Sequence, residues 1–156
     1  MPADNVTLPD DFRDFINALQ KFDVECVLVG GYAVGAHGRV RATVDIDFLY
    51  RASPENVDRV CRALRHFGAP ASAADPAFLG RDDSIVQVGV APNRIDLIAS
   101  ITGRTFDQVW SGAISVSIDG ERVRTIGLAD LLINKRATAR PQDLEDARLL
   151  SSRRKR

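Results

Sequence analysis

Two aspartates interrupt an otherwise apolar stretch of the chain, Val44-Asp-Ile-Asp-Phe-Leu-Tyr50. Aspartate is depleted in strands, and a charge on a buried strand is costly unless it is paired or bound to a metal. On a strand, Asp45 and Asp47 point to the same face, roughly 6.6 Å apart along it. Two carboxylates at that spacing can share a divalent cation or clamp a pair of them. The stretch therefore predicts a strand that carries a metal-dependent site.

A glycine pair precedes this strand, at the end of an earlier apolar run. Gly30 and Gly31 are expected at a turn between a strand at 25–29 and a short helix at 32–37. Glycine at such a turn lets backbone N–H groups approach a phosphate, and the helix dipole adds to the attraction. Turns use glycine pairs constantly, so the pair is weak evidence alone. Beside the two aspartates it favours a site that handles a nucleotide.

The polar connector 38–43 leads into the aspartate strand. Arg41 and Thr43 precede Asp45 at two-residue intervals, so an early start of the strand would place them on the face of Asp45 and Asp47. Arg39 and Arg41 are either phosphate ligands or solvated side chains.

A third aspartate lies in a later apolar strand. Strands are predicted at 84–91 and 94–99, joined as a hairpin by Pro92-Asn93, and Asp96 lies in the second. A lone strand aspartate is more often a satisfied structural residue. In a chain that already has two strand aspartates, the third favours a site.

The remaining patterns complete an α+β chain. Helical spacing of apolar residues predicts helices at 9–22, 53–67, 128–140 and 141–150 and a helical turn at 105–110. Strict alternation around Asp119-Gly120 predicts a hairpin of 114–118 with 122–126, and 69–76 is expected to be a loop. We expect one domain over 1–156, with a core at about 26–126 and C-terminal helices at about 128–152.

Composition limits the classes of partner. The formal net charge of the 156 residues is zero, so no overall basic field indicates nucleic acid. The basic tail 153–156 is either solvated or a nucleic-acid contact. The two cysteines show no spacing typical of a metal site, and the sequence has no recognisable signal peptide and no apolar run long enough to span a membrane. We therefore expect a cytoplasmic protein. Lysine occurs at only three positions against eighteen arginines, and one of the three is Lys135.

Two groups of residues carry a resemblance to a known family. Gly30-Gly31, the run Arg41-Ala-Thr43-Val-Asp45-Ile-Asp47 and Asp96 resemble the nucleotidyltransferase superfamily with the polymerase-β-like fold. The C-terminal pattern of Asp130, Lys135, Arg140, Asp143 and Asp146 is similar to small bacterial nucleotidyltransferases related to the toxins of type IV toxin–antitoxin systems. The resemblance covers about 26–150. It departs at the turn, where Gly-Gly replaces the usual Gly-Ser.

The resemblance implies a mixed sheet flanked by helices, with C-terminal helices completing the site. It also implies transfer with Mg²⁺ as cofactor, with two ions expected and Mn²⁺ as a substitute. Asp45 and Asp47 would bind both ions. Asp96 would complete the metal site and help to deprotonate the acceptor hydroxyl.

The nucleotide, an NTP such as ATP, would be held by the glycine turn and by cations. Gly30 and Gly31 would cradle the triphosphate, and Lys135 would neutralise phosphate charge. Arg41, Thr43 and Arg140 are further candidates for nucleotide binding. Asp143 and Asp146 would orient Lys135 or touch the nucleotide, or they are acids at a helix N-terminus stabilised by the dipole.

Three functional hypotheses follow. The first is an active enzyme that moves a nucleoside monophosphate to a hydroxyl on a protein, a tRNA or a small molecule, as part of a toxin–antitoxin system. The second is a non-catalytic, antitoxin-like module that binds a cognate toxin or antitoxin. The third, a metal-dependent hydrolase, is disfavoured because no histidine cluster accompanies the aspartates.

Overall fold

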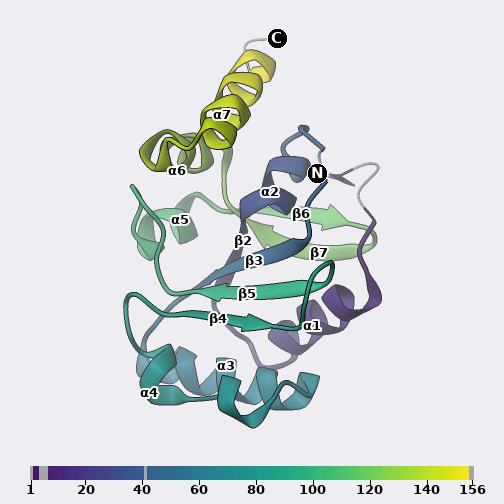
Figure 1. Cartoon of the computed structure of the whole chain (residues 1–156), viewed down its shortest axis with the longest axis vertical. Helices are drawn as coiled ribbons and strands as arrows, with labels where there is room; N and C mark the ends of the chain where they lie inside the picture. The colour runs from purple at the N-terminus through teal and green to yellow at the C-terminus, as the bar shows by residue number, and fades with distance from the viewer. Residues whose placement is uncertain (1, 4–6, 41, 155–156) are drawn as a thin grey trace.

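The chain folds around a seven-stranded mixed sheet (Figure 1). The structure is a computed structural model and describes residues 2–3, 7–40 and 42–154. The strand order is β1-β6-β7-β2-β3-β5-β4. The strands are β1 (Pro2–Ala3), β2 (Cys26–Val29), β3 (Asp45–Tyr50), β4 (Ile85–Val88), β5 (Arg94–Ile98), β6 (Ile114–Ile118) and β7 (Glu121–Thr125). Both parallel and antiparallel neighbours occur, so the predicted α+β class with a mixed sheet is confirmed.

Helices lie on both sides of the strands as Figure 1 displays them. They are α1 (Asp10–Lys21), α2 (Gly30–Ala36), α3 (Pro54–Phe67), α4 (Pro76–Leu79), α5 (Phe106–Gly112), α6 (Leu128–Thr138) and α7 (Pro141–Arg154), with a 3₁₀ turn η1 (Ala71–Ala73). In this view α3 and α4 lie below the sheet, and α6 and α7 lie above it. No helix in the described part of the chain has the length and apolar character needed to cross a bilayer.

Aromatic side chains pack against one face of β3 and bury it. The ring of Phe48 lies 6.0 Å from that of Phe15 in α1, and Phe15 meets Phe67 of α3 at 5.1 Å. On the same face, the buried Tyr50 hydroxyl donates to the Leu79 carbonyl over 2.6 Å. Because side chains alternate along a strand, this packing leaves the odd-numbered residues of β3, including Asp45, on the opposite face.

Helix α3 shows how local sequence sets the boundaries. The Ser53 hydroxyl caps the helix by accepting from the Asn56 amide, and Pro54 occupies the first turn. Gly68 ends the helix with φ of 93°, a left-handed conformation that glycine adopts without a steric penalty. The predicted helix at 53–67 is confirmed.

The structure corrects the predicted start of the aspartate strand. Strand β3 begins at Asp45, and Thr43 lies in the preceding coil with its hydroxyl donating to the Asp45 carbonyl. That local bond turns Thr43 away from a strand ladder, since threonine competes with regular structure in this way. Helix α2 also begins earlier than expected, at Gly30 itself.

Three other segments differ from expectation. The predicted loop 69–76 contains η1 and the start of α4, which Asp75 caps by accepting from Ala77. Strand β4 covers only 85–88 of the predicted 84–91, because Gly89 adopts φ of 82° and ends it. The short strand β1, which pairs with β6, had no sequence signal.

Candidate active site

Three carboxylates meet because β3 and β5 run parallel and in register. Asp47 lies opposite Asp96 in the sheet, and Asp45 lies opposite Arg94. Residues opposite one another on parallel strands share a face, so the three aspartates converge. One oxygen of each lies within 4.8 Å of the others. The sheet thus builds a triple carboxylate cluster from residues about fifty positions apart in sequence.

The glycine pair lies directly beneath this cluster. Gly30 adopts φ of 72°, and a Cβ there would lie 2.0 Å from Asp47 Oδ2. A Cβ on Gly31 would lie 2.9 Å from the Thr43 hydroxyl oxygen. No side chain caps the first turn of α2. Glycine is therefore required by close approach as well as by backbone conformation.

Lys135 and two aspartates of α7 form a buried charge cluster. Lys135 is 5% exposed, and its Nζ lies 3.1 Å from Asp143 Oδ1 and 3.3 Å from Asp146 Oδ2. Thr138 and Arg140 also donate to Asp143, over 2.8 and 2.6 Å. Burial alone would raise the pKa of Asp143, but the hydrogen bonds from Arg140, Thr138 and Lys135 hold that pKa at about 2. Asp143 is thus a firmly ionised partner that fixes Lys135.

Asp146 lies behind Lys135 and is fully buried. Its Oδ1 accepts from Arg39 Nε over 2.8 Å, which ties α7 to the segment after α2. Arg39 was expected to be either a phosphate ligand or a solvated side chain. In the structure it pairs with a buried carboxylate.

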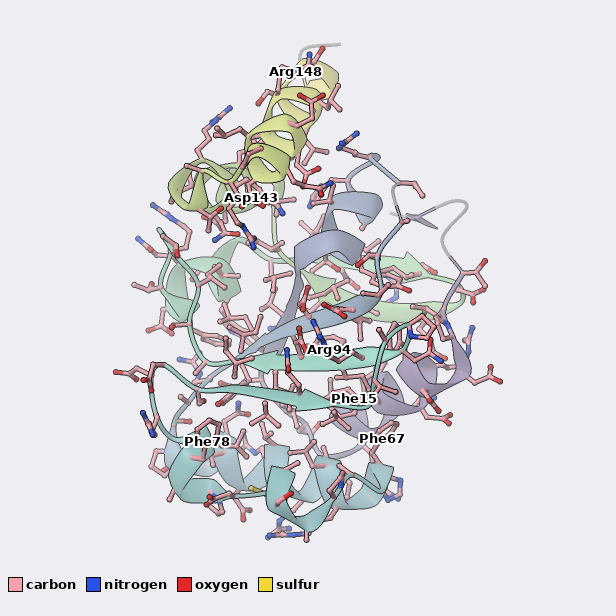
Figure 2. The ribbon with its side chains drawn as sticks, viewed as in Figure 1. Phe15, Phe67, Phe78, Arg94, Asp143 and Arg148 are labelled. Carbon is pink, nitrogen blue, oxygen red and sulfur yellow. The ribbon has the colours of Figure 1, made fainter. Side chains whose placement is uncertain are left out.

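A cleft of about 680 Å³ joins the carboxylate cluster to this charge cluster. Asp143 on α7 lies above Arg94 on the sheet in Figure 2. The predicted site residues that line the cleft are Gly30, Gly31, Thr43, Asp45, Asp47, Asp96, Lys135, Arg140 and Asp143. Asp146 does not line it, and Arg41 lies outside the residues that the structure describes.

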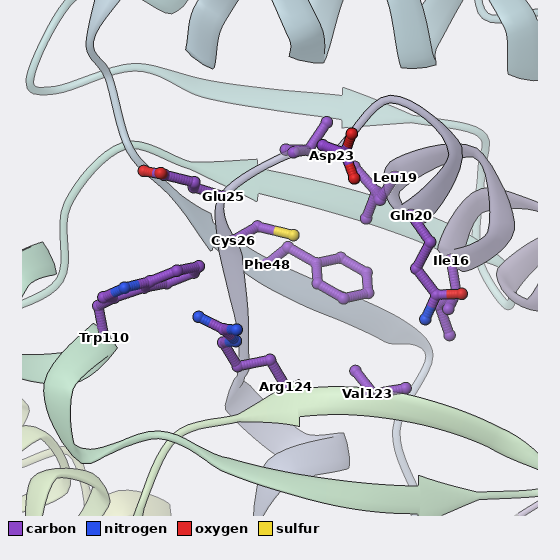
Figure 3. Close-up of a pocket in the computed structure, with 11 residues that line it drawn as sticks. Ile16, Leu19, Gln20, Asp23, Glu25, Cys26, Phe48, Trp110, Val123 and Arg124 are labelled. Atoms are coloured by element: carbon purple, nitrogen blue, oxygen red, sulfur yellow. The ribbon is translucent and has the colours of Figure 1, made fainter.

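A second cavity, of about 380 Å³, lies against Phe48, on the opposite face of β3 (Figure 3). Trp110, Arg124 and Cys26 line it, and none of the predicted site residues does. Burial raises the pKa of the Cys26 thiol to about 12, and the Arg124 charge lowers it only slightly by comparison. Cys26 is therefore not a thiolate nucleophile near neutral pH.

The three carboxylates concentrate negative charge at one place. Burial raises the pKa of Asp47 to about 7, helped by a hydrogen bond with Asp96 and by the charges of Asp96 and Asp45, against the pull of Lys135. Like charges held this close disfavour full ionisation. The cluster can hold its full negative charge near neutral pH only with added positive charge.

Arg94 is a cleft residue that the sequence interpretation missed. Its Nη2 donates to Asp45 Oδ2 over 2.6 Å, and its Nε lies 3.3 Å from Asp96 Oδ1. A usable signal existed, because Arg94 precedes Asp96 by two residues and so shares its strand face.

The donor set fits a divalent cation. Asp45 Oδ1 and Asp96 Oδ1 are buried and lack a hydrogen-bond partner among the described residues, although both are strong acceptors. Clustered carboxylate oxygens are the donors that Mg²⁺ and Mn²⁺ prefer. Asp45, Asp47 and Asp96 are thus suited to hold such an ion.

The fold and the cleft define a polymerase-β-like nucleotidyltransferase, as the resemblance predicted. The chain belongs to the family described as nucleotidyltransferase of unknown function (DUF6036), whose model matches residues 10–151. It is therefore assigned to a family of enzymes. No curated protein matches the chain in sequence.

Solved structures share the fold at low sequence identity. The lincomycin-bound lincosamide antibiotic adenylyltransferase LnuA has a TM-score of 0.59 at 17% identity, over 95% of this chain and 99% of its own. A putative nucleotidyltransferase from Thermotoga maritima has a TM-score of 0.59 at 14% identity, over 95% of each chain. ANT(2")-Ia in complex with adenylyl-2"-tobramycin has a TM-score of 0.58 at 16% identity, over 90% of this chain and 86% of its own.

Proposed function

We propose that the protein is a Mg²⁺-dependent nucleotidyltransferase that moves a nucleoside monophosphate from an NTP to a hydroxyl acceptor. The observation that carries this proposal is the triple carboxylate cluster, which faces Lys135 across one cleft. Two of its buried oxygens accept no hydrogen bond from the described residues. A bound divalent ion supplies positive charge to the reacting phosphate oxygens.

The reaction requires an acceptor oxygen to bond to the α-phosphorus while pyrophosphate leaves. Asp96 accepts the proton that the acceptor hydroxyl loses as its oxygen bonds to the phosphorus. Asp45 and Asp47 hold the metal site on the neighbouring strand, and the absence of a side chain at Gly30 leaves room for the Asp47 carboxylate.

The other side of the cleft binds the leaving phosphates. Gly30 and Gly31 present backbone amides at the start of α2, and Lys135 supplies a point charge whose position Asp143 and Asp146 restrain. Arg140 and Thr43 line the same cleft and contact the nucleotide. A phosphate contact from Arg41 stays a prediction.

ATP is the first donor to test and a small molecule the first acceptor. Two solved structures of the same fold contain antibiotic ligands: the adenylyltransferase LnuA has lincomycin bound, and ANT(2")-Ia has adenylyl-2"-tobramycin bound. A protein or tRNA acceptor and a toxin–antitoxin role stay predictions, which induced expression and growth arrest in a bacterial host would test.

The deciding experiment offers α-³²P-labelled ATP, GTP, CTP or UTP with Mg²⁺ and a cell lysate as the source of acceptor. The wild type should transfer label, Asp47→Ala should not, and Asp82→Ala, at an exposed turn, should behave as wild type. No transfer from any nucleotide, together with no Mg²⁺-dependent nucleotide binding, would favour the non-catalytic partner-binding module instead.

A further inference from the structure

Arg94 places a positive charge inside the carboxylate cluster. It is the first residue of β5 and lies directly opposite Asp45 (Figure 2), and its side chain is 34% exposed. Its guanidinium spans Asp45, at 2.6 Å, and Asp96, at 3.3 Å. Among the described residues, it is the one cation that forms an ion pair with any of the three aspartates, and it does so with Asp45 and Asp96.

The contacts of Arg94 are incomplete for a permanent pair. An arginine that settles on a carboxylate commonly forms two parallel hydrogen bonds. Here Nη2 bonds to Asp45, but Nε and the facing Asp96 Oδ1 have no hydrogen bond, and neither has Asp45 Oδ1. Arg94 thus supplies charge without satisfying the oxygens that surround it.

Arg94 and a divalent cation would compete for the same two carboxylates. The cluster that can hold an ion includes Asp45 and Asp96, which are the two residues that Arg94 spans. A guanidinium and a dication repel each other at that separation. Lys135 is already held by Asp143 and Asp146, so it is not free to take over from Arg94.

We propose that Arg94 is the resident counter-ion of the carboxylate cluster and that a divalent cation displaces it on binding. The guanidinium stabilises the three aspartates in the metal-free protein and weakens metal binding by competing with it. The inference rests on the metal site of the proposed function, but it concerns metal loading rather than transfer.

The test measures Mn²⁺ affinity of the full chain without nucleotide, by electron paramagnetic resonance or calorimetry. Arg94→Gln should bind Mn²⁺ about tenfold more tightly than wild type, since a charged hydrogen bond no longer has to be broken. Arg148→Gln is the matched control, because it removes an arginine that pairs with Glu145 on the exposed side of α7. Its Mn²⁺ affinity should equal that of the wild type.

Two further measurements guard against misfolding. In EDTA, Arg94→Gln should melt at a lower temperature than wild type. Saturating Mn²⁺ should then raise the melting temperature of Arg94→Gln by more than it raises that of wild type. If Arg94→Gln does not fold, Arg94→Met, which removes the charge but keeps a long side chain, should still bind Mn²⁺ more tightly than wild type.

Mn²⁺ affinity that is unchanged or weaker in the folded Arg94 variants would overturn the proposal. The proposed function would survive that result if the wild type still transfers label. A rise in Mn²⁺ affinity without any label transfer would instead support the role of Arg94 and count against the proposed function.

Discussion

Gly30 carries two separate constraints, a left-handed backbone and the nearby Asp47 carboxylate. Gly30→Ala should therefore cost about 1 kcal/mol of stability through its backbone and also push the Asp47 carboxylate aside. We expect a lower melting temperature and a loss of Mn²⁺ binding. Gly68→Ala is the control, because its φ is 93° but nothing lies within 4 Å of the added Cβ. If Gly30→Ala is less stable but still binds Mn²⁺ as the wild type does, the close approach of residue 30 to Asp47 does not matter for metal binding.

Asp47 gives the metal-free protein a characteristic pH dependence. Its pKa is raised from 3.8 to about 7 in the folded chain, so the folded state holds a proton that the unfolded state releases. The stability contributed by that proton is full below pH 3.8 and is lost as pH rises through about 7. In EDTA, the melting temperature should fall between pH 5 and pH 8. Asp47→Asn should flatten this slope, and an unchanged slope would contradict the assignment.

At the scale of elements, α6 and α7 are joined to the rest of the chain by buried charges. Lys135 of α6 pairs with two aspartates of α7, and Asp146 reaches back to Arg39 after α2. The helices that complete the cleft are thus held by paired ions as well as by the apolar packing of Leu131, Leu132 and Leu150.

Lys135→Met should destabilise the protein by about 3 kcal/mol, because it leaves buried carboxylates short of a partner. Lys135 is buried, so its loss is expected to affect the fold as well as the cleft. Urea denaturation measures the effect, with the exposed Lys21→Met as control. Equal stability of the two variants would mean that Lys135 serves nucleotide binding alone.

At the scale of the whole molecule, the cleft exists only when both ends of the domain are folded together. Nucleotide with Mg²⁺ should bind the folded state alone, and at a hundred times its dissociation constant it adds about 2.7 kcal/mol. For a chain of this size we expect a rise of about 5–10 °C in melting temperature with a non-hydrolysable ATP analogue. Asp47→Ala should show a much smaller rise. No shift with any nucleotide would contradict the site.

Much of the local structure could be predicted because its causes are local. Ser53 and Gly68 bound α3, and Asp119-Gly120 closes the β6–β7 hairpin with positive φ at both residues. The early strand start that would have included Thr43 is not found, and the helix at 76–79 was missed, since a single side-chain bond and a capping aspartate decide them.

By itself, the sequence determined the family and the carboxylate-bearing strands, because period-two alternation fixes which side chains share a face. It also determined the need for glycine at the turn. Only the tertiary structure decided which of these residues lie in contact with one another. The register of β3 against β5 brings Asp96 and Arg94 to the first two aspartates, and the return of α7 buries Lys135. Such contacts join residues far apart in the chain, so no local pattern encodes them.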